Sequence, residues 1–271
     1  MLVGYDFIMP ISASPPFHPA DRSDLTEEAR NRLIVALDVP DAHAAAALVA
    51  RLEGTCKWLK VGLELYVAVG PAVLEPLLAR GFSIFLDLKL HDIPNTVAGA
   101  VRSAAALGVQ MLTLHASGGP AMLTAARQAL EGHANPPQLL AVTVLTSMDQ
   151  TQLAAVGIDR SAAPQVELLA QTGIRAGING FVCSPEEVGR LRALTGPEGV
   201  LVVPGVRPAG ADAGDQKRIA TPADALRRGA SYLVVGRPVT QAQDPAAAAA
   251  TILAEMAKAL QNPSEDKNAR P

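Results

Sequence analysis

The stretch RLIVALD, residues 32–38, decides the fold, because a continuous apolar run ends there in a charged residue and an alanine-rich segment of helical length follows near 41–53. Runs that are apolar along their whole length are typical of parallel strands, which are buried on both faces. The same alternation recurs along the chain, and each of eight strand candidates precedes a helix candidate. The sequence therefore predicts an α/β fold that closes into a (β/α)₈ TIM barrel.

The remaining elements are expected at regular intervals after this first unit. The strand candidates are WLKVG (58–62), FSIFLDLK (82–89), VQMLTLHA (109–116), QLLAVTVLT (138–146), GFVCS (180–184), VLVVPG (200–205) and YLVVGRP (232–238). Helix candidates lie near residues 70–80, 94–107, 119–131, 163–176, 185–194, 221–228 and 244–260. An open, doubly wound sheet is the alternative, but LDVPD at 37–41 lacks the glycine-rich turn that usually follows its first strand.

Length and composition favour one domain with short extensions. The chain has 271 residues and a mass of 28.1 kDa, and α/β barrels of about 250 residues form a single unit. Four prolines and scattered charges between residues 10 and 31 indicate an extended arm without regular structure. We therefore expect an N-terminal arm over residues 1–31, the barrel over 32–260 and a C-terminal tail over 261–271.

Charge and cysteine content exclude several classes of function. The net charge is −3 and no block of one sign occurs, which argues against a nucleic-acid partner. Cys56 and Cys183 form no CxxC pair, so neither a disulfide framework nor a zinc site is suggested, and a reducing cytoplasm fits. No apolar run reaches the ~20 residues of a membrane span. The first residues also lack the basic leading region of a signal peptide.

Polar residues stand at or just after the ends of nearly all strand candidates. In a barrel these ends form the face that carries catalytic groups. The residues are Asp38, Lys60, Asp87, Lys89, His115, Thr146, Arg207 and Arg237. Asp87 and Lys89 are two positions apart on one strand, so we expect their side chains on the same face, toward the inside of the barrel.

Four of the charged residues make a balanced set. Lys60, Asp87, Lys89 and Asp92 are two cations and two anions, so each charge has a partner of opposite sign. A buried ion network with a purely structural role would look similar. The gathering of four charges at strand ends favours a functional site.

Two loops that contain arginine indicate a phosphate site. PGVRP at 204–208 contributes Arg207, and VVGRP at 234–238 contributes Gly236 and Arg237. The loops after strands seven and eight hold a phosphate in many barrels, with backbone N–H groups and arginine as donors. Each arginine alone could be an ordinary surface residue, but the two together predict a phosphate-bearing ligand.

The segment LDLKLHDIPNT, residues 86–96, resembles the signature of the orotidine 5'-phosphate decarboxylase family, whose core is Asp-x-Lys-x-x-Asp-Ile-x-x-Thr. The resemblance extends over about residues 32–258 through ALDVP, LKVG, TLHASGG, VLTSMD, PGVRP and VVGRP. Gln216 also falls where the family has a glutamine on the phosphate side. Such a likeness implies the barrel fold and a decarboxylase of a pyrimidine nucleotide.

The resemblance further implies a charged catalytic tetrad of Lys60, Asp87, Lys89 and Asp92. Asp92, together with Thr96, would come from the neighbouring subunit of a homodimer whose active site is shared across the interface. The substrate-binding residues would be Asp38 and Lys60 at the ribose, Thr146 at the pyrimidine, Gln216, Gly236 and Arg237 at the phosphate with Arg207, and Asp87, Ile93 and Thr96 from the signature.

The implied reaction converts orotidine 5'-phosphate to uridine 5'-phosphate and carbon dioxide, as in pyrimidine biosynthesis, without a cofactor or metal. Loss of carbon dioxide leaves a carbanion that is not delocalised into the ring π system. Lys89, held in its charged form by carboxylates, could stabilise the carbanion and donate the proton. The stretch 204–220 is a candidate lid that closes on the phosphate.

Two other functions remain open on the sequence. Magnesium-dependent sugar-phosphate decarboxylases and aldolases of the same barrel share Asp-x-Lys-x-x-Asp, but they place a glutamate on the second strand where this chain has Lys60, which would repel the metal. A non-catalytic nucleotide-binding barrel would be expected to lack Asp87 or Lys89, and both are present. Other reactive residues are given lesser roles: His115 in pocket shape, His91 in support or at an interface, and Cys183 as apolar filler.

Overall fold

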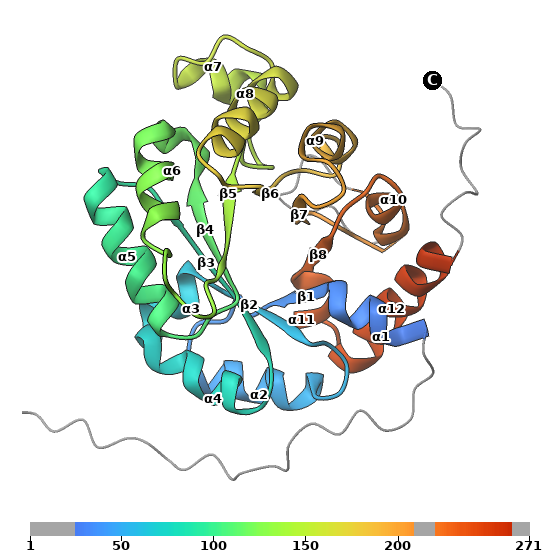
Figure 1. Cartoon of the computed structure of the whole chain (residues 1–271). Helices are drawn as coiled ribbons and strands as arrows, with labels where there is room; N and C mark the ends of the chain where they lie inside the picture. The colour runs from blue at the N-terminus through green and yellow to red at the C-terminus, as the bar shows by residue number, and fades with distance from the viewer. Residues whose placement is uncertain (1–24, 209–219, 262–271) are drawn as a thin grey trace, which may run out of the picture.

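Eight parallel strands close on themselves inside a ring of helices (Figure 1). The computed structural model describes residues 25–208 and 220–261. The strands are β1 Leu33–Ala36, β2 Trp58–Gly62, β3 Ser83–Leu90, β4 Met111–His115, β5 Gln138–Val142, β6 Gly180–Val182, β7 Val200–Val203 and β8 Tyr232–Val235. Each strand pairs with the next in sequence, and β8 pairs with β1. The predicted (β/α)₈ barrel is confirmed.

The helices cover the outside of the barrel. They are α1 Leu25–Arg32, α2 Ala42–Leu52, α3 Leu63–Val69, α4 Leu74–Ala79, α5 Pro94–Ala106, α6 Gly119–Gln128, α7 Gln150–Ala155, α8 Ala162–Arg175, α9 Val188–Thr195, α10 Pro222–Arg227, α11 Arg237–Thr240 and α12 Pro245–Gln261, with 3₁₀ turns η1 Gly70–Val73 and η2 Ala116–Gly118. All eight helix candidates of the sequence have a counterpart among them. No helix of the described residues combines the length and the apolar character needed to cross a membrane.

Three of the short helices were not expected from the sequence, and two have clear local causes. A capping box starts α7, in which Asp149 accepts a hydrogen bond from the Gln152 backbone while the Gln152 side chain accepts one from the Asp149 backbone. Pro238 stands in the first turn of α11, where its missing N–H costs nothing. The third, α3, follows β2 directly at Gly62, so no loop signal separates the two elements.

The N-terminal boundary differs from the expected one. Residues 25–31, which were assigned to an extended arm, belong to α1, and this helix packs against α12 (Figure 1). Ala29 on α1 is fully buried in the main core, which explains why the segment is ordered with the barrel. The barrel unit therefore begins at Leu25. Residues 1–24 of the expected arm, and the tail from 262 onward, lie outside the described residues.

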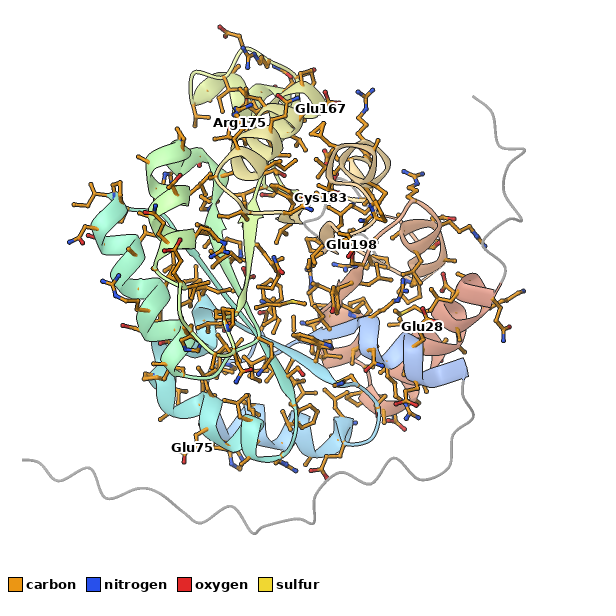
Figure 2. All side chains as sticks on the ribbon, viewed as in Figure 1. Glu28, Glu75, Glu167, Arg175, Cys183 and Glu198 are labelled. Carbon is orange, nitrogen blue, oxygen red and sulfur yellow. The ribbon has the colours of Figure 1, made fainter. Side chains whose placement is uncertain are left out.

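Apolar side chains fill two separate layers. The larger cluster lies between the strands and the helices, whereas a small cluster fills the inside of the barrel. The inner cluster consists of Ile34, Ala36, Phe85, Met111, Leu140, Val202 and Val234. Figure 2 shows side chains filling both layers, with Glu75 at the outer edge of the molecule. The inner layer closes the bottom of the barrel and leaves room for polar groups at the carboxyl ends of the strands.

One irregularity interrupts the strand ladder between β3 and β4. Leu86 pairs with Leu112, but the next pairing joins Leu90 to Leu114. From one pairing to the next, the chain advances four residues on β3 and two residues on β4. Within this bulge, Lys89 has a φ of 50°, the only positive value for a non-glycine residue among those described. The bulge turns the end of β3 into the site described next.

Candidate active site

A cavity of about 520 Å³ opens at the carboxyl ends of the strands. This volume is typical of a site for a small molecule. Eight residues expected from the sequence line it: Asp38, Lys60, Asp87, Lys89, Thr146, Arg207, Gly236 and Arg237. They come from the ends of six different strands and the loops behind them, so only closure of the barrel brings them together.

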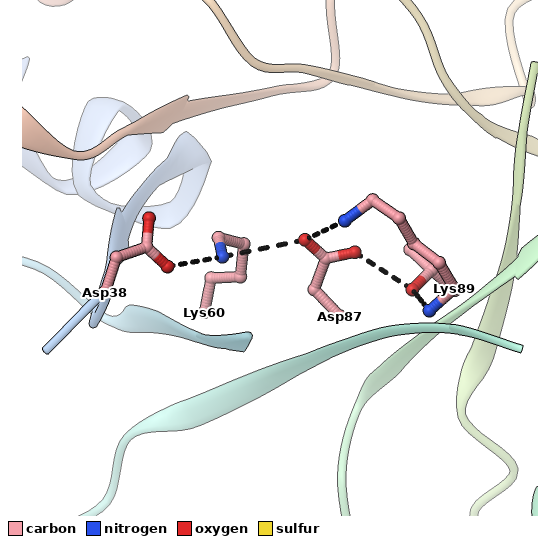
Figure 3. Close-up of polar contacts among 5 residues, drawn as sticks. Asp38, Lys60, Asp87 and Lys89 are labelled. Atoms are coloured by element: carbon pink, nitrogen blue, oxygen red, sulfur yellow. Dashed lines mark hydrogen bonds and ion pairs between the residues drawn. The ribbon is translucent and has the colours of Figure 1, made fainter. Parts of the chain in front are cut away.

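Four of these residues form a line of alternating charges (Figure 3). Lys60 Nζ lies 2.9 Å from Asp38 Oδ1 and 3.5 Å from Asp87 Oδ2. Lys89 Nζ donates a hydrogen bond of 2.8 Å to the same Asp87 oxygen. Asp87 thus lies between two ammonium groups, and the expectation that Asp87 and Lys89 share one face is met within the bulge.

Asp87 is the most buried carboxylate of this line, with 11% of its side chain exposed. Burial by itself raises its pKa, but the charges of Lys60 and Lys89 and hydrogen bonds from Lys89 and Thr113 outweigh burial, so the pKa lies below its usual value. Asp87 is therefore ionised at neutral pH.

The arginines lie on the loops that were predicted to bind phosphate. Arg207 follows β7 and is only 8% exposed, and its backbone N–H donates to the Ala220 carbonyl oxygen at 3.0 Å. Arg237 begins α11 after β8 and is exposed, with Gly236 before it. Both arginines line the cavity, so two cationic side chains border the space opposite the charged residues of β2 and β3. Gln216 and most of the expected lid, residues 209–219, lie outside the described residues.

Asp92, Ile93 and Thr96 do not line this cavity within one chain. All three are exposed after β3, and Ile93 has 67% of its surface accessible. Asp92 Oδ1 accepts a hydrogen bond from the Ile93 backbone N–H at 2.6 Å. The expectation that Asp92 and Thr96 serve the pocket of a neighbouring subunit stays a prediction.

Further residues near the cavity have distinct environments. His115 and His91 lie with ring centroids 5.5 Å apart. Burial, followed by the nearby His91 and Lys89, lowers the pKa of His115, so this histidine is neutral at pH 7. Cys183 lines the cavity and is 1% exposed. Figure 2 shows it near the carboxyl end of β6.

Sequence reasoning missed Thr113 and Gln241. Thr113 lies on β4, two positions before His115, and strand alternation from Met111 of the inner cluster could have placed it inside the barrel. Gln241 lines the cavity just after α11. No pattern in the sequence marked it, because the α11 turn itself was not expected.

Together, the barrel and the charged cavity define an α/β-barrel protein with an enzyme-like site for a small anionic molecule. Residues 31–252 match the model of the orotidine 5'-phosphate decarboxylase / HUMPS family. The chain is 53% identical over 234 residues to an orotidine 5'-phosphate decarboxylase of Moorella thermoacetica, an alignment that covers 84% of this chain and 93% of the relative. It is 51% identical over 228 residues to that of Saccharophagus degradans, with 84% and 96% covered.

Solved structures give the same result. The crystal structure of orotidine 5'-phosphate decarboxylase from Lactobacillus acidophilus superposes with a TM-score of 0.73 at 38% identity, covering 83% of this chain and 99% of that one. This chain therefore belongs to the orotidine 5'-phosphate decarboxylase / HUMPS family.

Proposed function

We propose that this chain is a carboxy-lyase that converts orotidine 5'-phosphate to uridine 5'-phosphate and carbon dioxide. The observation that carries the proposal is the line of alternating charges from Asp38 to Lys89, which opens into the same cavity as Arg207 and Arg237. The relatives named orotidine 5'-phosphate decarboxylase at about half identity support the choice of substrate. The product places the reaction in pyrimidine nucleotide synthesis.

The substrate would lie across the cavity with its phosphate on the arginine loops. Arg207, Arg237 and the backbone of Gly236 provide donors for the phosphate, and Gln216 joins them in the proposal. Asp38 and Lys60 would hold the ribose hydroxyls, because they form the end of the charged line away from Lys89. Thr146 would contact the pyrimidine, whose carboxylate then faces Asp87 and Lys89.

Lys89 is the proposed proton donor, and the reaction needs no cofactor. The bond between ring carbon C6 and the carboxylate breaks, carbon dioxide leaves, and the electron pair remains on C6. Lys89 Nζ then transfers a proton to C6, and solvent restores the proton on Lys89. Asp87 accepts a hydrogen bond of 2.8 Å from the ammonium group and fixes its position beside the carbon where the carbanion develops. Asp87 also disfavours the negative substrate carboxylate in the ground state.

The activity can be tested directly, and the test separates the three candidate functions. The purified protein is mixed with orotidine 5'-phosphate in excess chelator, and the loss of ultraviolet absorbance and the formation of uridine 5'-phosphate are measured. We expect full turnover. A reversible loss of activity that magnesium restores would instead support the metal-dependent class. Tight nucleotide binding without turnover would support a non-catalytic barrel.

The proposed assembly is a homodimer with shared sites. Leu63 and Val67 expose an apolar face of α3 after β2, and Ile93 exposes another apolar side chain after β3. Because β2 and β3 are neighbours in the barrel, these side chains follow adjacent strand ends. A second copy that covered them would also receive Asp92 and Thr96 close to its own cavity, which completes the tetrad of Lys60, Asp87, Lys89 and Asp92.

Complementation between inactive variants tests this sharing. Lys89→Ala and Asp92→Ala homodimers are each damaged at both sites, whereas a mixed dimer has one site with both lesions and one intact site. Refolding equal amounts together should give half mixed dimers and about a quarter of wild-type activity. No recovery, with mixed dimers verified by mass, would show that Asp92 serves its own subunit.

We place the enzyme in the cytoplasm, because its two buried cysteines are free thiols and a reducing compartment keeps thiols in that state.

A further inference from the structure

The bulge that presents Lys89 has no regular ladder to hold it. Between the Leu86–Leu112 and Leu90–Leu114 pairings, β3 contains two positions more than β4. Lys89 also has a φ of 50°, in the left-handed region that is strained for a non-glycine residue. A backbone in this state persists only where its surroundings fix it. The side chain that fixes it lies on β4.

Thr113 bridges the backbone of Lys89 and the side chain of Asp87. Its Oγ1 accepts a hydrogen bond of 2.9 Å from the Lys89 backbone N–H. The same hydroxyl lies 3.0 Å from Asp87 Oδ1 and donates its hydrogen to it, because an ionised carboxylate can only accept. The other oxygen of Asp87 accepts from Lys89 Nζ. Thr113, Asp87 and Lys89 therefore form a closed ring of three hydrogen bonds.

Thr113 is placed for this role and for no direct contact with a ligand. It is 0% exposed and is not among the residues that line the cavity. On β4 it follows Met111 of the inner cluster by two positions, so it lies one layer above the apolar floor of the barrel. The Thr113 hydroxyl is therefore the protein group that meets both the Lys89 N–H and Asp87 Oδ1.

We propose that Thr113 is a positioning residue of the decarboxylation site, whose hydroxyl fixes both the bulged backbone of Lys89 and the orientation of the Asp87 carboxylate. The proposal rests on the proposed function, in which Lys89 delivers the proton. Loss of the hydroxyl leaves an unpaired N–H at Lys89 and lets Asp87 rotate. The ammonium group then no longer has a fixed place relative to the reacting carbon, and a small misplacement is enough to slow the chemical step.

A pair of variants isolates the hydroxyl from the packing. Thr113→Val removes the hydroxyl and keeps the shape, whereas Thr113→Ser keeps the hydroxyl and removes a methyl group. We expect Thr113→Val to lower kcat about 10- to 100-fold with KM within about 3-fold, because one hydrogen bond to a charged group is lost away from the substrate. Thr113→Ser should retain kcat within about 3-fold. Thr143→Val is the matched control, because Thr143 is also buried on the barrel wall but donates to the Val182 carbonyl oxygen at 3.2 Å.

The pH profile gives a second readout that a purely structural role would not move. The Thr113 hydrogen bond is one of the causes that lower the pKa of Asp87, so its removal raises that pKa. The acid limb of kcat should therefore shift to higher pH in Thr113→Val and stay unchanged in Thr143→Val and Thr113→Ser. If Thr113→Val does not fold, the same comparison is made between Thr113→Ala and Thr113→Ser, which share the packing defect and differ in the hydroxyl.

The outcomes separate this inference from the proposed function. Wild-type kcat and an unshifted acid limb in Thr113→Val, with an active wild-type enzyme, would overturn the role of Thr113 alone. Equal losses in Thr113→Ser and Thr113→Val would also overturn it, because packing would then explain both. An inactive wild-type protein would overturn the decarboxylation, and with it the reaction that Thr113 is proposed to serve.

Discussion

The two ends of the barrel hold buried or partly buried cations in opposite ways. At the carboxyl end, Lys60 and Lys89 are paired with carboxylates next to an open cavity. At the amino end, Arg192 of α9 donates to neutral acceptors in the loops just before β7 and β8. Its Nη1 lies 2.7 Å from the Gly199 carbonyl oxygen, and its Nη2 lies 2.7 Å from the Gly229 carbonyl oxygen.

The difference between the ends lies in what remains available to a ligand. Arg192 also donates to the Gly196 carbonyl oxygen at 2.8 Å and to Ser231 Oγ at 2.9 Å, so its hydrogen-bonding capacity is used to join loops. The Lys89 ammonium group has three N–H donors, and beside the cavity it can direct one of them to a bound ligand while another contacts Asp87. A cation bound by backbone carbonyls therefore serves stability, whereas a cation held by carboxylates at a cavity serves chemistry.

The largest effect is expected at the carboxyl end. Lys89→Ala should lower kcat by at least about 10³-fold and leave nucleotide binding nearly intact, because the electrostatic donor acts on charge that develops in the transition state. Steady-state kinetics and ligand titration measure the two quantities. The free energy of unfolding should change little, since Asp87 keeps Lys60 as a partner. A near-normal kcat would remove Lys89 from the mechanism.

The converse variant is Arg192→Ala. We expect a loss of about 2 to 4 kcal/mol in the free energy of unfolding, because several backbone carbonyl groups lose a charged donor at once. The kcat of the folded fraction should remain unchanged. Denaturant titration measures the loss, and Arg190→Ala is the control, because the Arg190 side chain is 65% exposed and forms a surface ion pair with Glu167. A stability equal to that of the control would contradict the structural role of Arg192.

A smaller kinetic effect is expected at Arg237, because its proposed partner is the non-reacting phosphate. Arg237→Ala should lower kcat/KM about 10- to 100-fold, the contribution of one or two charge-assisted hydrogen bonds. The comparison is repeated with a substrate that lacks the phosphate. If that substrate is affected as strongly as the complete one, Arg237 does not bind the phosphate.

The smallest effect is a pH dependence of stability that arises from Asp87. Its pKa in the folded protein lies below the ordinary value of 3.8, so ionised Asp87 stabilises the fold above that pH. This contribution is lost as the pH falls from about 4 through the folded pKa. The stability difference between wild type and Asp87→Asn should therefore shrink below pH 4, by at most about 1.4 kcal/mol per pH unit. A difference that is constant between pH 3 and 6 would contradict the lowered pKa.

The sequence by itself determined the barrel and most of the cavity. Each strand is a short apolar run that ends in polar residues, and in a closed parallel barrel all such ends meet on one face, so Asp38, Lys60, Asp87, Arg207 and Arg237 could be assigned to one site. The boundary at residue 25 escaped prediction, because α1 is held by packing against α12 at the far end of the chain.

Only the tertiary structure decided how the charged groups are held. The bulge at Lys89 follows from the pairing of β3 with β4, and Thr113 becomes the partner of Asp87 across 26 positions of sequence. Arg192 likewise meets the Gly229 carbonyl oxygen across 37 positions. Neither contact has a local signal, because a hydrogen bond between distant residues depends on strand register and loop path, whereas hydrophobic periodicity reports only which face of an element is buried.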